Sequence, residues 1–168
     1  MKKIIVIGCP GSGKSTFARA LHTVTGIPLI HLDLLFWNAD RTTVERPVFL
    51  ARLEDALRGE AWIIDGNYAS TMELRMQPCD TVIFLDYPTE LCLEGIRARR
   101  GKPRPDMPWV EPENEIDEAF VETVKTFSHQ QRPAVMALLS KYSHKNIHVF
   151  RSRQEADAFL SGLRQEIR

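Results

Sequence analysis

The chain has 168 residues, 43% hydrophobic and 26% charged, and its 22 Lys and Arg residues balance 22 Asp and Glu residues. These values are ordinary for one globular domain, and the zero net charge excludes a global basic field for nucleic acid. The three cysteines are too scattered for a zinc ribbon or a disulfide framework, and no apolar run is long enough to cross a membrane. We therefore predict a single cytoplasmic domain (1–168), monomer or homodimer, without direct binding to nucleic acid or membrane.

The first motif along the chain is a glycine-rich turn. Residues 4–7 form a β-branched run, and residues 8–16 read GCPGSGKST, which fills every fixed position of the phosphate-binding P-loop G-x-x-x-x-G-K-[ST]. Glycines let backbone N–H groups converge on a phosphate, and a helix that begins near Lys14 adds its positive end. Lys14 can reach the outer phosphates, and the Ser15 hydroxyl can bind Mg²⁺. The predicted ATP-binding residues of this turn are Gly8, Pro10, Gly11, Ser12, Gly13, Lys14, Ser15 and Thr16.

Four further apolar runs predict strands, and spacings of three and four predict helices between them. We expect the strands at 27–32, 62–64, 80–85 and 147–150, and helices at 14–25, 47–57, 70–76, 89–99, 116–139 with a break at Arg132-Pro133, and 156–167. Continuous apolar strands that alternate with helices are typical of a parallel sheet covered on both faces. The prediction is an α/β fold: a three-layer P-loop NTPase fold with a five-stranded parallel sheet.

Polar clusters follow the predicted strands at their carboxyl ends, where α/β sheets bind ligands. They are residues 8–15, Asp33, residues 65–68 and Asp86. The stretch between the fourth strand's helix and the next helix contains Pro103, Pro105, Pro108 and Pro112, which predict an irregular, mobile segment. We expect it to form a short lid-like insert at about 100–115.

Together these motifs resemble the adenylate-kinase-like small P-loop kinases, which include nucleoside monophosphate kinases, shikimate kinase and gluconate kinase. The resemblance covers essentially the whole chain and is strongest to the bacterial proteins labelled DNA topology modulation protein, or adenylate-kinase-related. The residues that carry it are His31-Leu32-Asp33, Asp65-Gly66-Asn67-Tyr68, Leu85-Asp86-Tyr87-Pro88, Arg104-Pro105-Asp106 and Phe127…Arg132-Pro133. It implies ATP and Mg²⁺ as cofactors and a small-molecule phosphate acceptor.

The chain also departs from adenylate kinases. Their Asp-Gly-Phe-Pro-Arg is Asp65-Gly66-Asn67-Tyr68-Ala69 here, so the substrate-side arginine is missing from its usual place, and Arg75 is a candidate substitute. Their AMP-binding Thr-Gly-Asp after the second strand is His31-Leu32-Asp33. These departures argue against AMP as the acceptor.

Candidate roles follow from the residues and from the resemblance. Lys14 neutralises phosphate charge, and Ser15 with a strand-end carboxylate holds Mg²⁺, either Asp65, which we favour, or Asp86. Asp33 is a candidate general base or acceptor-orienting group, with a simple turn cap as the alternative. The predicted catalytic residues are Lys14, Asp33, Arg99 and Arg132, and the predicted acceptor-binding residues are Asp33, Trp37, Asp65, Asn67 and Arg75.

The arginines have an alternative interpretation as well. Arg97, Arg99 and Arg100 before the insert, and Arg132 after it, resemble lid arginines. The loop Arg151-Ser152-Arg153 resembles one that packs on the nucleotide base, but cations also favour solvated helix ends. The leading hypothesis is a Mg²⁺·ATP-dependent small-molecule kinase of the nucleoside monophosphate kinase type. The alternatives are a nucleotide-binding regulator that affects DNA topology and an ATPase switch without an acceptor.

Overall fold

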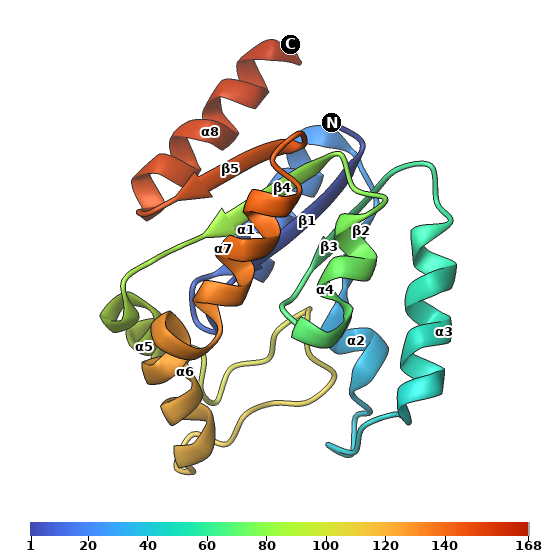
Figure 1. The fold of residues 1–168 in the computed structure, drawn as a ribbon. Coiled ribbons are helices and arrows are strands. Elements are labelled where there is room, and N and C mark those ends of the chain that lie inside the picture. The colour runs from blue at the N-terminus through green and yellow to red at the C-terminus, as the bar shows by residue number, and fades with distance from the viewer. Residues whose placement is uncertain (168) are drawn as a thin grey trace.

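The computed structural model describes residues 1–167, and within this range five parallel strands form one sheet (Figure 1). The strands are β1 (Lys3–Gly8), β2 (Leu29–His31), β3 (Trp62–Asp65), β4 (Thr81–Leu85) and β5 (Asn146–Phe150). Their order across the sheet is β2-β3-β1-β4-β5. The predicted α/β fold with a five-stranded parallel sheet is confirmed.

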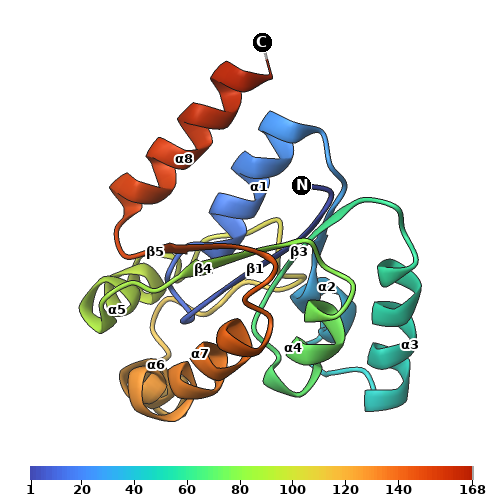
Figure 2. The same ribbon diagram turned by 45° about the horizontal axis from the view of Figure 1, so that its top comes forward.

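Eight helices surround the sheet in the described range. They are α1 (Lys14–Thr25), α2 (Leu32–Phe36), α3 (Arg46–Leu57), α4 (Ala69–Met76), α5 (Thr89–Ala98), α6 (Glu118–Gln130), α7 (Arg132–Lys141) and α8 (Arg153–Glu166). Figure 2 shows α1 and α8 on one face of the sheet and α4, α6 and α7 on the other, while α3 lies beyond the β2 edge. The sheet is therefore the middle of three layers.

The central strands are buried because helices cover both of their faces. Residues 4–8 of β1 and all residues of β3 and β4 are buried, and most are the β-branched or aromatic types that suit a pleated core. In the register, Val6 lies beside Asp65, and Gly8 lies beside Leu85. The P-loop and Asp65 therefore leave the sheet at the same edge.

Helix ends agree with the local sequence signals. Glycines in the left-handed region stand directly before and after α1: Gly13 (φ 88°) and Gly26 (φ 70°). At the start of α8, the Ser152 hydroxyl accepts a hydrogen bond from the Glu155 N–H (3.2 Å), while the Glu155 carboxylate accepts one from the Arg151 N–H (2.7 Å). Residues 152–155 have the Ser-x-x-Glu spacing of a capping box, and the glutamate here reaches the N–H of the residue before the N-cap.

Two predicted boundaries are wrong. Residues 32–36 form the short helix α2, so the second strand ends at His31; Leu32 is fully buried and packs on Gly66 after β3. Ile116 lies before α6 and is 62% exposed, because the helix begins at Glu118 and the carboxylate of Asp117 caps it. No helix in residues 1–167 combines the length and apolar character needed to span a bilayer.

Candidate active site

The P-loop connects β1 to α1 and has the backbone that its glycines allow. Gly11 (φ 84°) and Gly13 (φ 88°) are both in the left-handed region, and the Ser12 N–H donates to the Cys9 carbonyl (3.0 Å). The ammonium group of Lys14 also donates to the Cys9 carbonyl (3.3 Å). Burial lowers the pKa of Lys14, and the charges of Asp65 and Asp33 oppose that shift, so both carboxylates lie near this amine.

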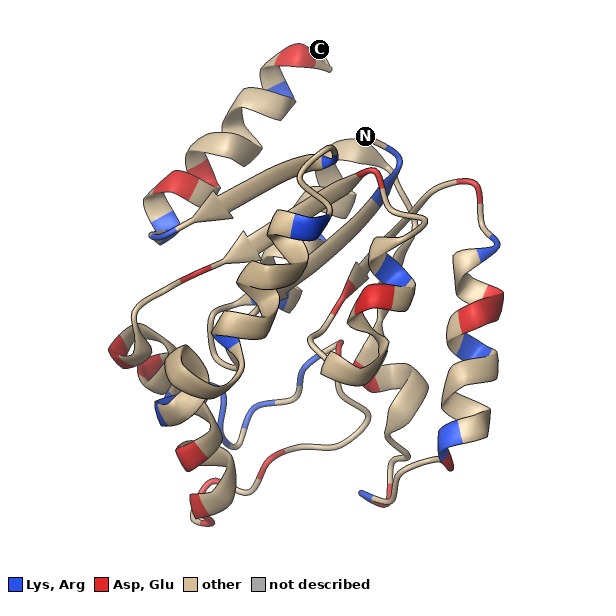
Figure 3. Ribbon diagram, viewed as in Figure 1, with Lys and Arg blue, Asp and Glu red and all other residues tan. Residues whose placement is uncertain are grey.

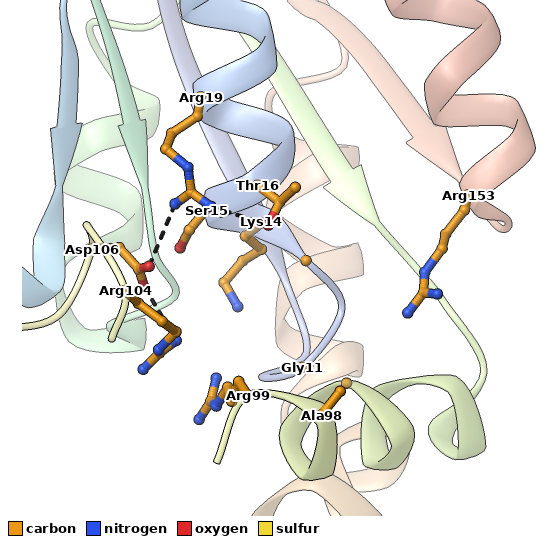
Figure 4. A pocket seen from close by; sticks show the side chains of 12 residues that line it. Gly11, Lys14, Ser15, Thr16, Arg19, Ala98, Arg99, Arg104, Asp106 and Arg153 are labelled. Carbon is orange, nitrogen blue, oxygen red and sulfur yellow. Dashed lines mark hydrogen bonds and ion pairs between the residues drawn. The ribbon is translucent and has the colours of Figure 1, made fainter. Parts of the chain in front are cut away.

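A pocket of about 290 Å³ opens beside this loop. Its walls come from the P-loop, α1, the carboxyl end of α5, the insert and the start of α8 (Figure 4). Its cationic side chains are Lys14, Arg19, Arg99, Arg104 and Arg153, and its one carboxylate is Asp106. Guanidinium groups and a helix N-terminus bind phosphate oxygens well, so this pocket fits a polyphosphate.

The insert is irregular in backbone, as predicted, but ion pairs tie it to the rest of the site. Asp106 pairs with Arg19 of α1 (3.5 Å) and with Arg104 (3.2 Å). Glu111 pairs with Arg104 (3.3 Å) and with Arg99 (2.9 Å), the residue that ends α5. Figure 3 shows the Lys and Arg residues at the start of the insert, where the chain passes below the carboxyl ends of the strands. The sequence prediction of a mobile segment did not include these contacts.

On the other side of Lys14, a carboxylate is held by a tyrosine. The Tyr68 hydroxyl donates a hydrogen bond of 2.5 Å to Oδ1 of Asp33, and Tyr68 has the left-handed backbone (φ 38°) that side chains rarely adopt. Burial raises the pKa of Asp33, whereas the Tyr68 hydrogen bond and the Lys14 charge lower it. Asp33 is thus a half-buried carboxylate that the Tyr68 hydroxyl orients.

Aromatic rings close the same side. Trp37, directly after α2, packs edge to face on Trp109 of the insert, with 5.6 Å between ring centroids. The guanidinium of Arg41 lies 5.3 Å from the centroid of Trp109. Trp37 therefore contacts the insert, while its other aromatic neighbour, Phe36, is partly buried and packs against the core.

The residues at the carboxyl ends of β2 and β3 fit Mg²⁺. Asp65 is buried, and its Oδ1 lies 2.6 Å from Nδ1 of His31, which orients the carboxylate. Ser15 lines the pocket in the first turn of α1. Within residues 1–167 no group of three His, Cys, Asp or Glu side chains could hold a metal by itself. Mg²⁺ is held by one or two protein oxygens together with phosphates, so a hydroxyl and one carboxylate suffice.

Two solved structures share this architecture over nearly their whole length. The shikimate kinase from Bacteroides thetaiotaomicron superposes with a TM-score of 0.59 at 17% sequence identity, covering 98% of this chain and 97% of that one. The shikimate kinase from Aquifex aeolicus gives 0.58 at 18% identity, covering 98% and 94%. This chain has the P-loop fold of these shikimate kinases. No protein-family model and no curated protein matches it.

Asn67 and Arg75, both predicted to bind the acceptor, form hydrogen bonds to backbone groups instead. The Asn67 amide accepts from the Gly8 N–H (3.0 Å) and donates to the Gly8 carbonyl (2.5 Å). Arg75 is fully buried and donates to the carbonyls of Gly66, Asn67 and Tyr68. Burial lowers the pKa of Arg75 to about 10. Both side chains therefore hold the loop after β3, and neither lines the pocket.

Several predicted arginines also lie elsewhere. Arg132 forms a bidentate ion pair with Asp86, and both contacts are 2.8 Å long. The pair occupies the guanidinium group of Arg132 and also the carboxylate of Asp86, which was the alternative metal ligand. Arg97 and Arg151 are exposed and do not line the pocket. Of the arginines predicted from sequence, Arg99 is the one that does.

Sequence reasoning missed Arg19, Asp106 and Glu111 as site residues and gave Arg104 no role. Arg19 follows Ser15 by four residues on α1, so helical periodicity places both on one face and offers a signal. In the loop from Arg151 to Arg153 it is Arg153, the first residue of α8, that lines the pocket. The insert residues carry no periodic signal.

Proposed function

We propose that this protein is a Mg²⁺·ATP-dependent phosphotransferase that acts on a hydroxyl group of a small molecule. The observation that carries the proposal is the pocket between the P-loop and the insert, which Lys14 and four arginines line. The oriented carboxylate of Asp33 lies close to the same lysine. The shikimate kinases that share the fold are themselves phosphotransferases by name, which supports the same class of reaction here.

Phosphoryl transfer needs positioning and charge neutralisation more than covalent help from the protein. In our proposal the P-loop amides and Lys14 bind the outer phosphates of ATP, and Arg99 and Arg104 neutralise them from the insert side. Asp33 accepts the proton of the attacking hydroxyl. The insert shields the pocket from water, which favours transfer to the acceptor over hydrolysis.

The proposed Mg²⁺ ligands are Ser15 and Asp65, with Asp86 disfavoured because Arg132 already binds both of its oxygens. Bound there, the ion would neutralise charge on the phosphate oxygens of ATP. His31 would hold the Asp65 carboxylate in place through the contact already described.

The proposed acceptor is defined by its chemical class: a nucleotide other than AMP, a nucleoside or another hydroxyl compound. AMP is disfavoured because the arginine expected after Asp65-Gly66 is absent and Arg75 is turned to backbone carbonyls. The nucleoside monophosphate kinase subtype and the narrower resemblance to the DNA topology modulation proteins are predictions from sequence; the structural neighbours are shikimate kinases.

The test is ADP release from Mg²⁺·ATP against a panel of nucleotides, nucleosides, shikimate and other small hydroxyl metabolites. Lys14→Ala and Asp33→Asn are compared with wild type, and Lys125→Ala, an exposed lysine of α6, is the matched control. We expect one acceptor to raise turnover well above background, both site variants to lose it and Lys125→Ala to keep it. If ATP binds but no acceptor stimulates ADP release, an ATPase switch replaces the kinase.

A further inference from the structure

Asp106 presents an electrostatic problem in a pocket built for a polyanion. It lies among cationic pocket residues and is only 2% exposed. A carboxylate beside a phosphate site repels the ligand, and burying an unpaired carboxylate is costly. Each of its oxygens has its own arginine, however: Oδ1 faces Arg19 of α1, and Oδ2 faces Arg104 of the insert. Asp106 therefore joins two elements that are 87 residues apart in sequence.

Glu111 also links two arginines, Arg104 and Arg99. One Nη of Arg104 donates to Asp106 and the other to Glu111, so both arms of its guanidinium fork are held. Glu111 also accepts from Nε and Nη2 of Arg99, at 3.3 and 2.9 Å. The two carboxylates thus order three guanidinium groups in a continuous chain from α1 to α5: Arg19, Asp106, Arg104, Glu111 and Arg99.

This chain of ion pairs explains how an irregular segment presents ordered arginines. Like-charged guanidinium groups repel, and burial together with the nearby charge of Arg104 lowers the pKa of Arg99. Carboxylates between them offset that repulsion and remove rotamer freedom before any ligand arrives. A group ordered in advance loses less conformational entropy on binding.

We propose that Asp106 and Glu111 are positioning residues, which hold Arg19, Arg104 and Arg99 at the phosphate pocket and thereby strengthen the binding of a nucleoside triphosphate. This inference rests on the proposed function, because it assumes that the pocket takes ATP. The predicted change in nucleotide affinity has the opposite sign to the change that simple electrostatics predicts. Removing a negative charge beside a polyanion should tighten binding if only charge matters, and should weaken it if positioning dominates.

The experiment measures the affinity for the Mg²⁺ complex of a non-hydrolysable ATP analogue by calorimetry, and needs no acceptor. We expect Asp106→Asn and Glu111→Gln each to weaken binding about tenfold, the scale of a lost hydrogen bond between charged groups. Glu113→Gln is the matched control, an exposed glutamate in the same insert and outside this chain of ion pairs; it should change affinity less than about twofold. Asp106→Glu keeps the charge and should restore most of the binding.

Amide hydrogen exchange without nucleotide is the second measurement. Residues 100–115 should exchange faster in Asp106→Asn and Glu111→Gln than in wild type and Glu113→Gln. If wild type binds the analogue and both variants bind it as tightly or more tightly, the positioning role is overturned and the proposed function stands. If wild type does not bind it, the proposed function fails. Should Asp106→Asn fail to fold, as seen by circular dichroism, Glu111→Gln decides the matter alone.

Discussion

Gly11 of the P-loop lies against Gly95 of α5 with no room for a side chain between them. A Cβ on Gly95 would lie 2.0 Å from the Gly11 carbonyl oxygen, and a Cβ on Gly11 would lie 2.1 Å from the Cys92 carbonyl oxygen. Both neighbours are backbone atoms, which cannot turn away as a flexible side chain can. Helix α5 therefore supports the P-loop through bare backbone, and the phosphate site depends on a residue distant from it in sequence.

This contact predicts that Gly95→Ala weakens nucleotide binding. In an open helix the same change stabilises by about 0.5–1 kcal/mol, but here the methyl group displaces the P-loop, and overpacking of this kind costs about 1–3 kcal/mol. We expect affinity for ATP to fall about tenfold. Gly162→Ala in α8, where nothing lies within 4 Å of the added Cβ, is the control and should raise stability without altering affinity. Calorimetry measures the affinity for ATP, and urea unfolding measures the stability. If Gly95→Ala and Gly162→Ala changed both quantities equally, the close contact between Gly11 and Gly95 would be refuted.

Tyr68 predicts a pH effect on the proposed reaction. Asp33 must be ionised to accept a proton, so kcat/KM falls as the pH drops through its pKa. The Tyr68 hydroxyl favours the ionised form, and its removal in Tyr68→Phe raises the pKa of Asp33 further. The acidic limb of the kcat/KM profile should therefore move to higher pH. Tyr142→Phe removes a comparable hydrogen bond, to Glu73 (3.0 Å), and should leave the profile in place. An unmoved limb in Tyr68→Phe would show that Asp33 is not the base.

The amide of Asn67 predicts a stability effect. It bonds both the N–H and the carbonyl of Gly8, so Asn67→Ala should lower the free energy of unfolding by about 1–3 kcal/mol. Asn67→Asp keeps an acceptor for the Gly8 N–H but places a carboxylate against the Gly8 carbonyl, so it should cost more. Urea denaturation measures both, with the exposed Asn114→Ala as control. A loss of acceptor affinity at unchanged stability would instead return Asn67 to the acceptor site.

The ion pair of Arg132 with Asp86 predicts strong coupling. Asp86 is only 11% exposed, so removing Arg132 leaves a largely buried carboxylate unpaired, whereas Arg132 itself is 33% exposed. Arg132→Gln and Asp86→Asn should each lower the free energy of unfolding by about 1–2 kcal/mol, and the double variant should cost little more than one of them. Arg58→Gln, at an exposed helical pair with Asp55, should change it by less than about 0.5 kcal/mol. Additive effects of the two changes would contradict the coupling.

The fold was predictable because its signals are local. Each apolar run of β1, β3, β4 and β5 is contiguous in sequence, and the glycines and capping residues stand next to the helices that they end or begin. Where the prediction was wrong, at residues 32–36, a short apolar run was compatible with both strand and helix. Packing of Leu32 on Gly66 accompanies the helical choice, and that contact is not visible in the sequence.

In the candidate site, too, some residues could be predicted from local sequence, and others are placed only by the tertiary structure. By itself the sequence determined the P-loop, because Gly8 to Ser15 form one consecutive motif whose backbone creates the phosphate cradle, and it placed Asp33 and Asp65 at the carboxyl ends of predicted strands. That these two strands are neighbours is seen only in the sheet. Only the tertiary structure decided which cations face that cradle. Asp86 holds Arg132, and backbone carbonyls hold Arg75, whereas Arg19, Arg104 and Arg153 line the pocket. The reason is physical: an arginine is long and flexible, and its position depends on the carboxylates and carbonyls that folding brings within reach, which can be far away along the chain.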